Sequence, residues 1–297
     1  MLLDSASLWF RAYHGVPSTV VSPDGRPVNA VRGFLDHIAR LLREHQPGGL
    51  VACLDEDWRP AFRVAAVPSY KTHRLVQASG TDTPDDLAPQ VEIILDVLRA
   101  MGFATAGAPG FEADDVIGTL AAASAGEVDV VSGDRDLFQV IRPGVRVLYT
   151  VERGRPYDDA AVAARYGIPN GQAYADFALL RGDPSDGLPG VAGVGEKTAA
   201  TLVRRYGGVD QILAALDAGD AVPAAAKLLH ARDYLVAAKA VVRVATDVPL
   251  PSMDAAIPAA PTQPERLLSL VDRWGLSSPV ERLLGALATL QRPISGG

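Results

Sequence analysis

The sequence contains little cysteine and no long hydrophobic run. Its 297 residues include one cysteine, Cys53, which excludes an internal disulfide and favours a reducing compartment. Cys53 lies in the apolar stretch 50–54, which predicts a buried structural thiol. No apolar stretch approaches the roughly 20 residues that span a bilayer, and the N-terminus lacks the basic-then-apolar pattern of a signal peptide. We therefore expect a cytoplasmic protein with no membrane segment.

Histidine is also scarce, and its spacing excludes the common zinc sites. The five histidines form no HxxxH or Cys/His pattern, so a zinc site is not expected. The chain is 48% hydrophobic and 21% charged, which suits one large globular domain or two smaller ones. The net charge of −7 argues against nucleic-acid binding. That argument loses its force if the acids are concentrated at a metal site and the bases lie elsewhere.

Two groups of carboxylates stand out in the first half of the chain. Glu112, Asp114 and Asp115 open an apolar run with helical spacing, whereas Asp134 and Asp136 follow a β-branched run typical of a buried parallel strand. Strand ends and helix starts face one crevice in an open α/β sheet. Acids gathered there repel one another, and hard divalent cations such as Mg²⁺ or Mn²⁺ relieve that repulsion. The first group could merely serve a helix N-terminus, but that leaves the second group unexplained.

Two further acids end predicted strands. Asp4 follows a very short apolar strand, where it is either an N-cap for the next segment or a metal ligand. Asp55 follows the strand predicted at 50–54. The other predicted elements are helices at 29–44, 83–99, 158–166 and 174–180, strands at 103–106, 128–131 and 145–149, a helical region at 209–244, a proline-containing linker at 246–264 and helical periodicity at 265–290. This order predicts an α/β fold.

Residues 58–81 carry bases and no acid. The bases are Arg59, Arg63, Lys71 and Arg74, and aromatic side chains are interleaved with them. Because the apolar pattern is weak, we expect this segment to lie outside the core. It is either a solvated loop or a phosphate-handling segment that orders on substrate binding, since Arg and Lys bind phosphate and aromatic rings stack on bases.

The stretch 181–207 combines two acids with glycines that lead into a helix. These residues are Asp183, Asp186, Gly190, Gly193, Gly195, Lys197 and Thr198. A nucleotide-binding P-loop joins its Gly and Lys directly and follows a strand, whereas here Glu196 intervenes and no strand precedes the loop. A helix–hairpin–helix that grips the phosphates of duplex DNA without sequence specificity fits better.

Several motifs together carry a family resemblance. FEADDVIGTL, SGDRDLFQV and GDPSDGLPGVAGVGEKTA resemble the bacterial 5′ nucleases, which comprise flap endonucleases and the 5′→3′ exonuclease domain of DNA polymerase I. FRAYH, YKTHR and TPDDL match as well, and the likeness covers residues 2–249. It implies a stand-alone nuclease with a PIN-like core at 1–165 (central, mostly parallel sheet and a helical arch at 58–81), a helix–hairpin–helix region at 166–250, and a linker with C-terminal helices at 251–297.

The resemblance also implies a role for each matching residue. Asp4, Asp55, Glu112, Asp114 and Asp134 match the ligands of one metal site, Asp115 and Asp136 match neighbouring carboxylates, and Asp183 and Asp186 match the ligands of a second metal. Asp134 and Asp136 count as catalytic, as do Lys71 and Arg74, which match a basic pair that reaches the scissile phosphate. DNA contacts are implied for Arg11, Tyr70, Lys71, Arg74, Gly190, Gly193, Gly195, Lys197 and Thr198, with K⁺ bound through backbone carbonyls of the hairpin.

The function implied is two-metal hydrolysis of DNA phosphodiesters at 5′ ends and flap junctions, with Mg²⁺ or Mn²⁺, in replication and repair. The expected substrates are DNA with a 5′ flap, overhang, nick or gap, RNA-primer ends stay open, and the protein is expected to be a monomer. One departure is Gly187, where the family usually has Asn, and we expect it to loosen the loop of the second metal. The alternatives are a non-catalytic DNA-binding relative and a PIN-type ribonuclease.

Overall fold

The computed structural model describes residues 1–73 and 86–291, and the chain forms two compact units. Unit 1 consists of Met1–Leu54, Thr81–Ala106 and Leu250–Gly297, and unit 2 of Asp55–Gly80 and Gly107–Pro249. Among the described residues, each unit contains three strands with covering helices. No helix in these residues is long and apolar enough to cross a membrane. The predicted domain boundaries after residues 165 and 250 stay a prediction.

The three strands of unit 1 are parallel and short. They are β1 (Leu2–Asp4), β2 (Val51–Cys53) and β3 (Ala104–Ala106), with β2 in the middle. Both β1 and β2 are buried along their whole length, as expected of parallel strands covered on both faces. Cys53 is fully buried, which confirms the predicted structural thiol.

Five described helices belong to unit 1. They are α1 (Ser5–Gly15), α2 (Asn29–His45), α5 (Leu87–Met101), α13 (Pro264–Trp274) and α14 (Ser277–Leu290). The Asp4 carboxylate accepts the N–H of Ser7 at 3.1 Å, so Asp4 is an N-cap, one of the two roles that the sequence left open. Helix α5 ends at Met101, close to the predicted end at residue 99, and Gly102 with its φ of 89° provides a left-handed C-cap. The predicted start of this helix at Thr83 and Pro84 lies outside the described residues.

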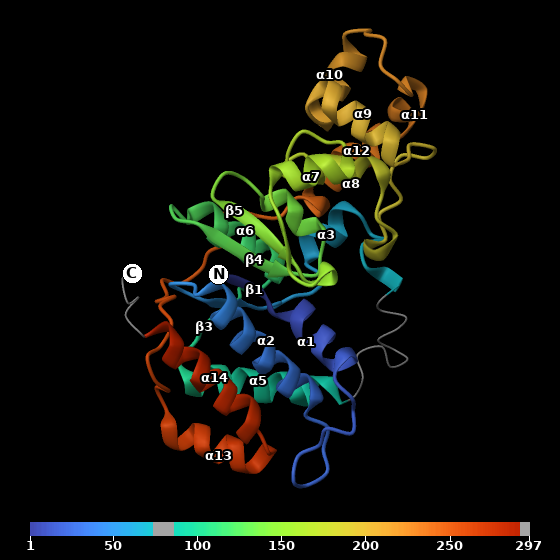
Figure 1. Ribbon diagram of the computed structural model, residues 1–297. Coiled ribbons are helices and arrows are strands. Elements are labelled where there is room, and N and C mark those ends of the chain that lie inside the picture. The colour runs from blue at the N-terminus through green and yellow to red at the C-terminus, as the bar shows by residue number, and fades with distance from the viewer. Residues whose placement is uncertain (74–85, 292–297) are drawn as a thin grey trace, which may run out of the picture. The chain divides into compact units, whose positions relative to one another are not determined.

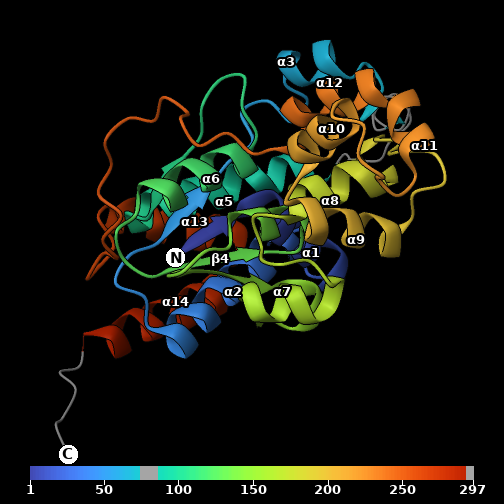
Figure 2. The same ribbon diagram turned by 90° about the horizontal axis from the view of Figure 1, so that it is seen from above.

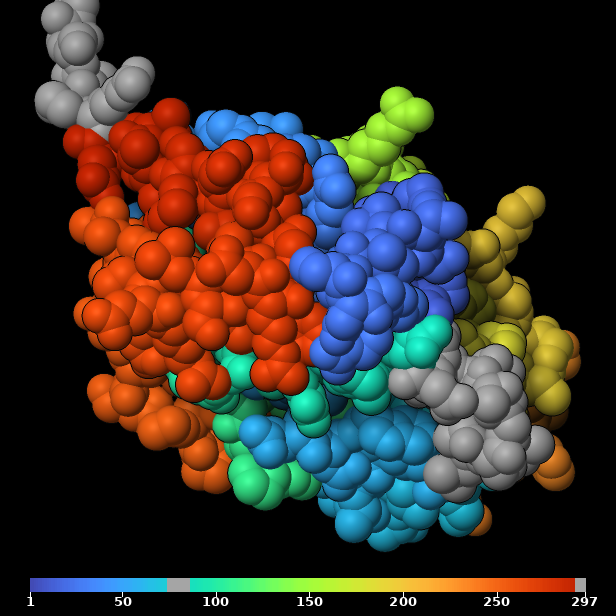
Figure 3. Space-filling model, turned by 90° about the horizontal axis from the view of Figure 1, so that it is seen from below, coloured from blue at the N-terminus to red at the C-terminus, as the bar shows by residue number. Residues whose placement is uncertain are grey.

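The C-terminal helices build the core of unit 1 together with the N-terminal part of the chain. Helix α14 packs along α2, and α13 packs on α5 (Figure 1). At the end of α13, the Trp274 ring lies 4.3 Å from the guanidinium carbon of Arg26. Figure 3 shows the surfaces of these two segments, red and blue, in contact. The predicted helical periodicity after residue 265 is therefore that of packed helices.

The three strands of unit 2 pair in both the parallel and the antiparallel sense. Strands β4 (Val128–Ser132) and β5 (Val145–Tyr149) are parallel, and β6 (Arg155–Tyr157) pairs antiparallel with β5. Over both units the sheet strands are mostly parallel, which confirms the predicted fold class, although β6 was not predicted. The helices are α3 (Ala61–Ala66), α6 (Ala113–Ala123), α7 (Asp159–Tyr166), α8 (Tyr174–Arg181), α9 (Glu196–Tyr206), α10 (Val209–Asp217), α11 (Ala225–His230) and α12 (Arg232–Val242), with 3₁₀ turns η1 (Asp136–Val140), η2 (Thr150–Glu152) and η3 (Pro184–Asp186).

An aromatic cluster holds η1 in place. The Phe138 ring stacks on Tyr157 with centroids 4.6 Å apart, and it packs edge-on against Tyr149 and Tyr174. All four rings are buried. Because η1 begins at Asp136, this packing fixes the backbone that carries the second group of acids.

The predicted helix–hairpin–helix is present. Helices α8 and α9 lie side by side in Figure 2, and the glycine-rich loop joins them. Among the residues that the structure describes, α8 and η3 come directly before the loop and no strand does, so the loop lacks the preceding strand of a P-loop. Helix α12 packs on α8 and on α3.

The expectation that the basic segment lies outside the core is wrong for its described part. Residues 61–66 form α3, and Arg63 and Tyr70 are only 2% and 3% exposed. Lys71 is also largely buried. The apolar pattern gave no sign of this because the buried side chains are polar and bind carboxylates of α6 and its N-cap rather than apolar neighbours.

Candidate active site

The first group of acids surrounds the start of α6. Glu112 is the N-cap, and it forms a capping box with Asp115, whose Oδ2 accepts the Glu112 N–H at 3.2 Å. The Oδ1 atom of Asp55 accepts the N–H of Ala113 at 2.7 Å. Asp114 lies half-buried in the first turn of the helix. The helix start therefore brings Asp55 together with the three acids that follow residue 111.

The second group follows β4. Ser132 Oγ accepts the N–H of Asp134 at 2.8 Å, and Asp134 Oδ1 accepts the N–H of Asp136 at 2.9 Å. The Oδ1 atom of Asp136 is buried and has no hydrogen-bond partner. These short local bonds place two carboxylates at the carboxyl end of a strand, as the sequence predicted.

The third group lies on η3. Asp183 is 5% exposed and caps the 3₁₀ turn by accepting the N–H of Ser185 at 2.9 Å. Burial raises the pKa of Asp136 well above its ordinary value, and the charges of Asp134, Asp186 and Asp183 add to that effect. The carboxylates after β4 and those on η3 are therefore close enough in unit 2 to repel one another.

This donor set fits a hard divalent cation. Asp134, Asp136, Asp183 and Asp186 all carry carboxylates, the ligands that Mg²⁺ and Mn²⁺ prefer, and the partnerless oxygen of Asp136 is the acceptor that a cation would satisfy. Within residues 1–73 and 86–291, no three or more acidic, histidine or cysteine side chains stand at the mutual distances of a closed metal site. The cluster thus has the right chemistry for a cation while its side chains stay apart.

Glu112 joins the acids to the basic segment. Its carboxylate accepts hydrogen bonds from the Lys71 ammonium, the Arg63 guanidinium and the Tyr70 hydroxyl, the last at 2.7 Å. Burial raises the pKa of Glu112, although the charges of Lys71 and Arg63 act in the opposite direction. Tyr70 was predicted to contact DNA; its ring is buried, and its hydroxyl is bound to this acid.

Lys71 lies between the first and third groups of acids. Its backbone N–H donates to the carbonyl oxygen of Asp186 at 2.9 Å, and its φ of 49° is in the left-handed region. Ser69 Oγ donates to the carbonyl of Gly187 at 3.0 Å. The η3 loop is therefore packed closely on the segment that carries Lys71, in contrast to the loosening expected from Gly187.

The glycines of the hairpin contact α11, α12 and the end of α8. The N–H of Gly190 donates to the Tyr234 hydroxyl at 3.1 Å, and Gly190 lies so close to Gly182 that neither could carry a Cβ atom without a shift. The carbonyl of Gly193 accepts the ammonium of Lys227 at 2.9 Å. Gly195 is the N-cap of α9, and Lys197 is exposed in its first turn, followed by half-buried Thr198.

Three predicted site residues remain: Asp4, Arg11 and Arg74. Asp4 and Arg11 belong to unit 1, where Arg11 is exposed on α1. Burial and the charges of Arg40 and Arg11 lower the pKa of His37 to about 4. Arg74 lies outside the described residues.

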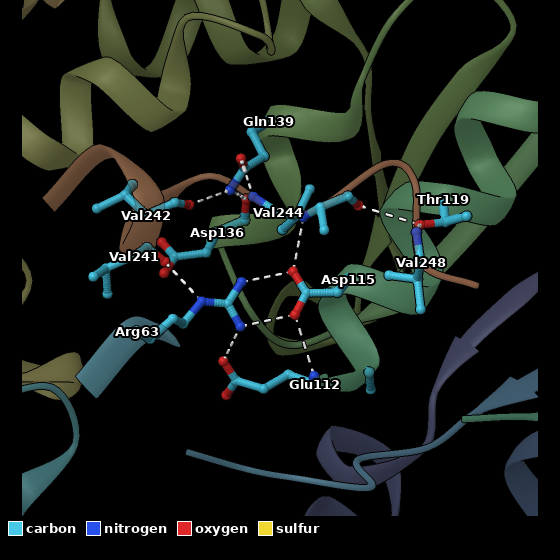
Figure 4. A network of polar contacts seen from close by, with 12 residues as sticks. Arg63, Glu112, Asp115, Thr119, Asp136, Gln139, Val241, Val242, Val244 and Val248 are labelled. Carbon is cyan, nitrogen blue, oxygen red and sulfur yellow. Dashed lines mark hydrogen bonds and ion pairs between the residues drawn. The ribbon is translucent and has the colours of Figure 1, made fainter. Parts of the chain in front are cut away.

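The sequence interpretation missed two polar residues of the site. Arg63 was grouped with the solvated bases, although its spacing to Val67 and Tyr70 follows the helical period and could have indicated a shared buried face. Gln139 binds the chain after α12 through both ends of its amide, at Val242 and Val244 (Figure 4). No local pattern marks Gln139, because its partners lie more than a hundred positions away.

An α/β sheet with acids at its strand ends and helix starts, followed by a glycine-rich hairpin between helices, is the architecture of a nuclease that acts on the phosphate backbone. Two family models match the chain: the 5′-3′ exonuclease N-terminal resolvase-like domain over residues 1–167, and the 5′-3′ exonuclease C-terminal SAM fold over residues 170–265. The chain belongs to the 5′-3′ exonuclease family.

Relatives over the full length support this assignment. A 5′-3′ exonuclease of Mycobacterium tuberculosis is 52% identical, covering 98% of both chains, and one of Streptomyces coelicolor is 53% identical over 97% of this chain and 99% of the relative. The DNA polymerase I of Mycobacterium bovis is 42% identical over 75% of this chain and 25% of its own length. The similarity to the polymerase thus extends over only a quarter of that protein.

Solved structures share the fold. The bacteriophage T5 5′-exonuclease with bound divalent zinc has a TM-score of 0.66 at 18% identity, covering 98% of this chain and 99% of that one. Flap endonuclease-1 from Methanococcus jannaschii has a TM-score of 0.62 at 18% identity, covering 97% and 92%. The arrangement of elements is therefore conserved across proteins of low sequence identity.

Proposed function

We propose that this 5′ nuclease hydrolyses DNA phosphodiesters at 5′ ends and flap junctions by two-metal catalysis. The observation that carries the proposal is the cluster of Asp134, Asp136, Asp183 and Asp186, in which one buried carboxylate oxygen has no partner and its pKa is raised by its neighbours. A phosphate cannot approach such a cluster unless its negative charge is offset. Bound cations provide that offset.

The acids Asp4, Asp55, Glu112, Asp114, Asp115, Asp134, Asp136, Asp183 and Asp186 are the predicted ligands of Mg²⁺ or Mn²⁺. Two such ions, when bound, supply an activated water and stabilise the leaving oxygen. The chain itself contributes the orientation: Ser132 and Asp134 hold the backbone after β4 through hydrogen bonds of 2.8 and 2.9 Å. The aromatic packing around Phe138 keeps that turn rigid.

Lys71 is the proposed partner of the scissile phosphate, together with Arg74. In the structure the Lys71 ammonium is bound to Glu112, so a buried carboxylate keeps it next to the acids in the absence of substrate. A cation aimed at the charge that develops on the phosphate contributes on the order of 10²–10³ in rate. The backbone N–H of Lys71 donates to the carbonyl of Asp186, so this base lies beside the predicted ligands of the second metal, Asp183 and Asp186.

The hairpin is proposed to hold the downstream duplex, with Gly190, Gly193, Gly195, Lys197 and Thr198 contributing. Exposed Lys197 and the N-terminus of α9 offer positive charge and backbone N–H groups to phosphates. K⁺ is a predicted ligand of the hairpin carbonyls. DNA with a 5′ flap, overhang, nick or gap is the proposed substrate of a monomeric cytoplasmic enzyme, and primer RNA can be attacked as well because the chemistry acts on phosphate.

Cleavage of a 5′-flap duplex by the wild type and by Asp134→Ala, with Mg²⁺, Mn²⁺ or EDTA, tests this function. We expect metal-dependent cutting near the junction that is lost in the variant. The matched control is Asp217→Ala, which removes an acid that is exposed and paired with Arg232, and which should cut like the wild type. Binding without cutting under every metal would indicate a non-catalytic relative, and preference for single-stranded RNA would indicate a PIN-type ribonuclease.

A further inference from the structure

Arg63 connects three separate parts of unit 2. Its Nε donates to the carbonyl of Val241 at 3.0 Å, and its two terminal nitrogens donate to Asp115 at 2.8 and 2.6 Å. One of these nitrogens also binds Glu112 (Figure 4). Because the guanidinium is a planar fork with fixed directions, it sets the mutual orientation of α3, the start of α6 and the end of α12.

Asp115 has no acceptor capacity left for a cation. A carboxylate offers about four lone-pair positions, and the Asp115 side chain accepts two bonds from Arg63, one from the Glu112 N–H at 3.2 Å and one from the Ala245 N–H at 2.8 Å. The residue is 0% exposed. Asp136 differs, since its Oδ1 has no partner.

The chain after α12 is held against α6 by the same group of side chains. Gln139 accepts the N–H of Val244 and donates to the carbonyl of Val242, each at 3.0 Å, and Thr119 Oγ1 accepts the N–H of Val248 at 3.1 Å. Figure 4 shows these bonds on both sides of Asp115. Asp115 therefore lies at the centre of the contacts that hold residues 242–248 against α6, and its bond to Ala245 is one of these contacts.

From these contacts we propose that Arg63 and Asp115 are a positioning pair for the reaction, and that Asp115 is not a metal ligand. The pair fixes Glu112 and the α3 segment, which in turn carries Lys71 to Glu112. This inference rests on the proposed nuclease function, because positioning has meaning only if Lys71 and the acids act on a phosphodiester. Asp115 thus has a positioning role, whereas Asp136 stays among the predicted metal ligands.

Conservative variants keep the test interpretable, because truncation of either side chain to alanine would leave buried hydrogen-bonding groups of the other unsatisfied. Asp115→Asn keeps an acceptor oxygen, and Arg63→Lys keeps one positive charge while losing the fork. Asp136→Asn is the matched comparison for a proposed ligand. Each variant is first checked by thermal unfolding, so that Mn²⁺ binding and kinetics are measured only on folded protein.

The experiment titrates Mn²⁺ calorimetrically without DNA and measures kcat and KM on a 5′-flap duplex. We expect Asp115→Asn and Arg63→Lys to keep the wild-type Mn²⁺ stoichiometry and KM, while kcat falls by up to about 10²-fold, the effect of roughly 1 Å of misplacement. The double variant should lose no more than the worse single variant, since both changes break one interaction. Asp136→Asn should lose bound Mn²⁺.

Loss of Mn²⁺ in Asp115→Asn, equal to that in Asp136→Asn, would overturn the proposal. An unchanged kcat in both variants, or additive losses in the double variant, would overturn it as well. Failure of the nuclease function itself is seen separately, as a wild type that does not cut the flap duplex under any metal.

Discussion

The backbone of Gly187 lies directly against the carbonyl oxygen of Ser69. No Cβ atom fits at this position, because it would meet that oxygen and would lie 3.4 Å from the backbone nitrogen of Lys71. The φ of Gly187 is +72°, which is also unfavourable for most side chains. The η3 loop and the Lys71 segment therefore share one close backbone contact.

Gly187→Asn, which restores the residue usual in the family, is expected to lower flap cleavage. The added side chain must push the Ser69 carbonyl away and so displace Lys71, and a shift of about 1 Å can cost about 10²-fold in rate. Single-turnover cleavage at saturating enzyme measures this. Gly154→Ala is the control: its φ is +79°, but nothing lies within 4 Å of the added atom, so it bears the backbone strain without the contact. Equal activity of Gly187→Asn and the wild type would contradict the expectation.

Asp136→Asn is expected to stabilise the metal-free protein at neutral pH. Burial and three neighbouring carboxylates raise the pKa of Asp136 above the ordinary value of 3.8. The folded state therefore binds a proton that the unfolded state releases, and the stability due to this group, complete below 3.8, is lost as pH rises toward the raised pKa. If Asp136→Asn raises the free energy of unfolding by about 1 kcal/mol, its Tm should rise by roughly 2–4 °C, the shift typical of a domain of 150–250 residues.

Thermal unfolding in EDTA at several pH values checks this. The gain should shrink as the pH approaches the ordinary pKa, where the wild-type carboxyl is protonated in both states. Added Mn²⁺ should raise the Tm of the wild type more than that of the variant. Asp210→Asn should show no gain, because that carboxylate is exposed and its pKa is lowered by Lys239. A lower Tm for metal-free Asp136→Asn at neutral pH would speak against mutual repulsion in the cluster.

Gly118→Ala is expected to destabilise the protein although alanine favours a helix. The added Cβ would lie 2.6 Å from the carbonyl oxygen of Ala245 and 2.8 Å from Cγ2 of Val244. Both residues belong to segment 242–248, which is held against α6. Overpacking of this kind costs about 1–3 kcal/mol, more than the gain of roughly 1 kcal/mol from helix propensity.

Gly285→Ala is the matched control for Gly118→Ala. Gly285 lies within α14, and nothing is within 4 Å of its added Cβ, so this variant should be more stable than the wild type. Urea unfolding measures both changes. If both variants were stabilised by the same amount, the segment after α12 would not be packed on α6 as the structure places it.

Lys197→Ala is expected to weaken binding of duplex DNA and to reduce its salt dependence. An ammonium that contacts one phosphate contributes about 0.9 to the slope of log K against log salt concentration, and Lys197 is exposed at the start of α9. Fluorescence anisotropy in EDTA, over a range of salt, measures the slope without cleavage. Lys239→Ala should leave it unchanged, because that ammonium is paired with Asp210. An unaltered slope for Lys197→Ala would place the duplex elsewhere.

Local sequence patterns were enough for many of the elements and for the acids at their ends, although not for α3 or β6. A β-branched run followed by Asp134 and Asp136 predicted a strand with acids at its end, and the structure has both acids just after β4. The Gly102 stop of α5 was readable for the same reason, because it depends on the backbone angle of one residue. The Asp4 cap of α1 was one of two roles that its local position indicated. β6 escaped prediction because its three residues, Arg155-Pro156-Tyr157, contain a proline and form no apolar run.

The sequence by itself determined which residues could bind metal and DNA, because residue type and local spacing set that chemistry. Only the tertiary structure decided what surrounds them. The partners of Arg63 lie 52 positions away at Asp115 and 178 positions away at Val241, and the contact between Gly187 and Ser69 joins two distant loops. Burial of a charged group depends on such distant partners, since only they can replace the water that it loses on folding.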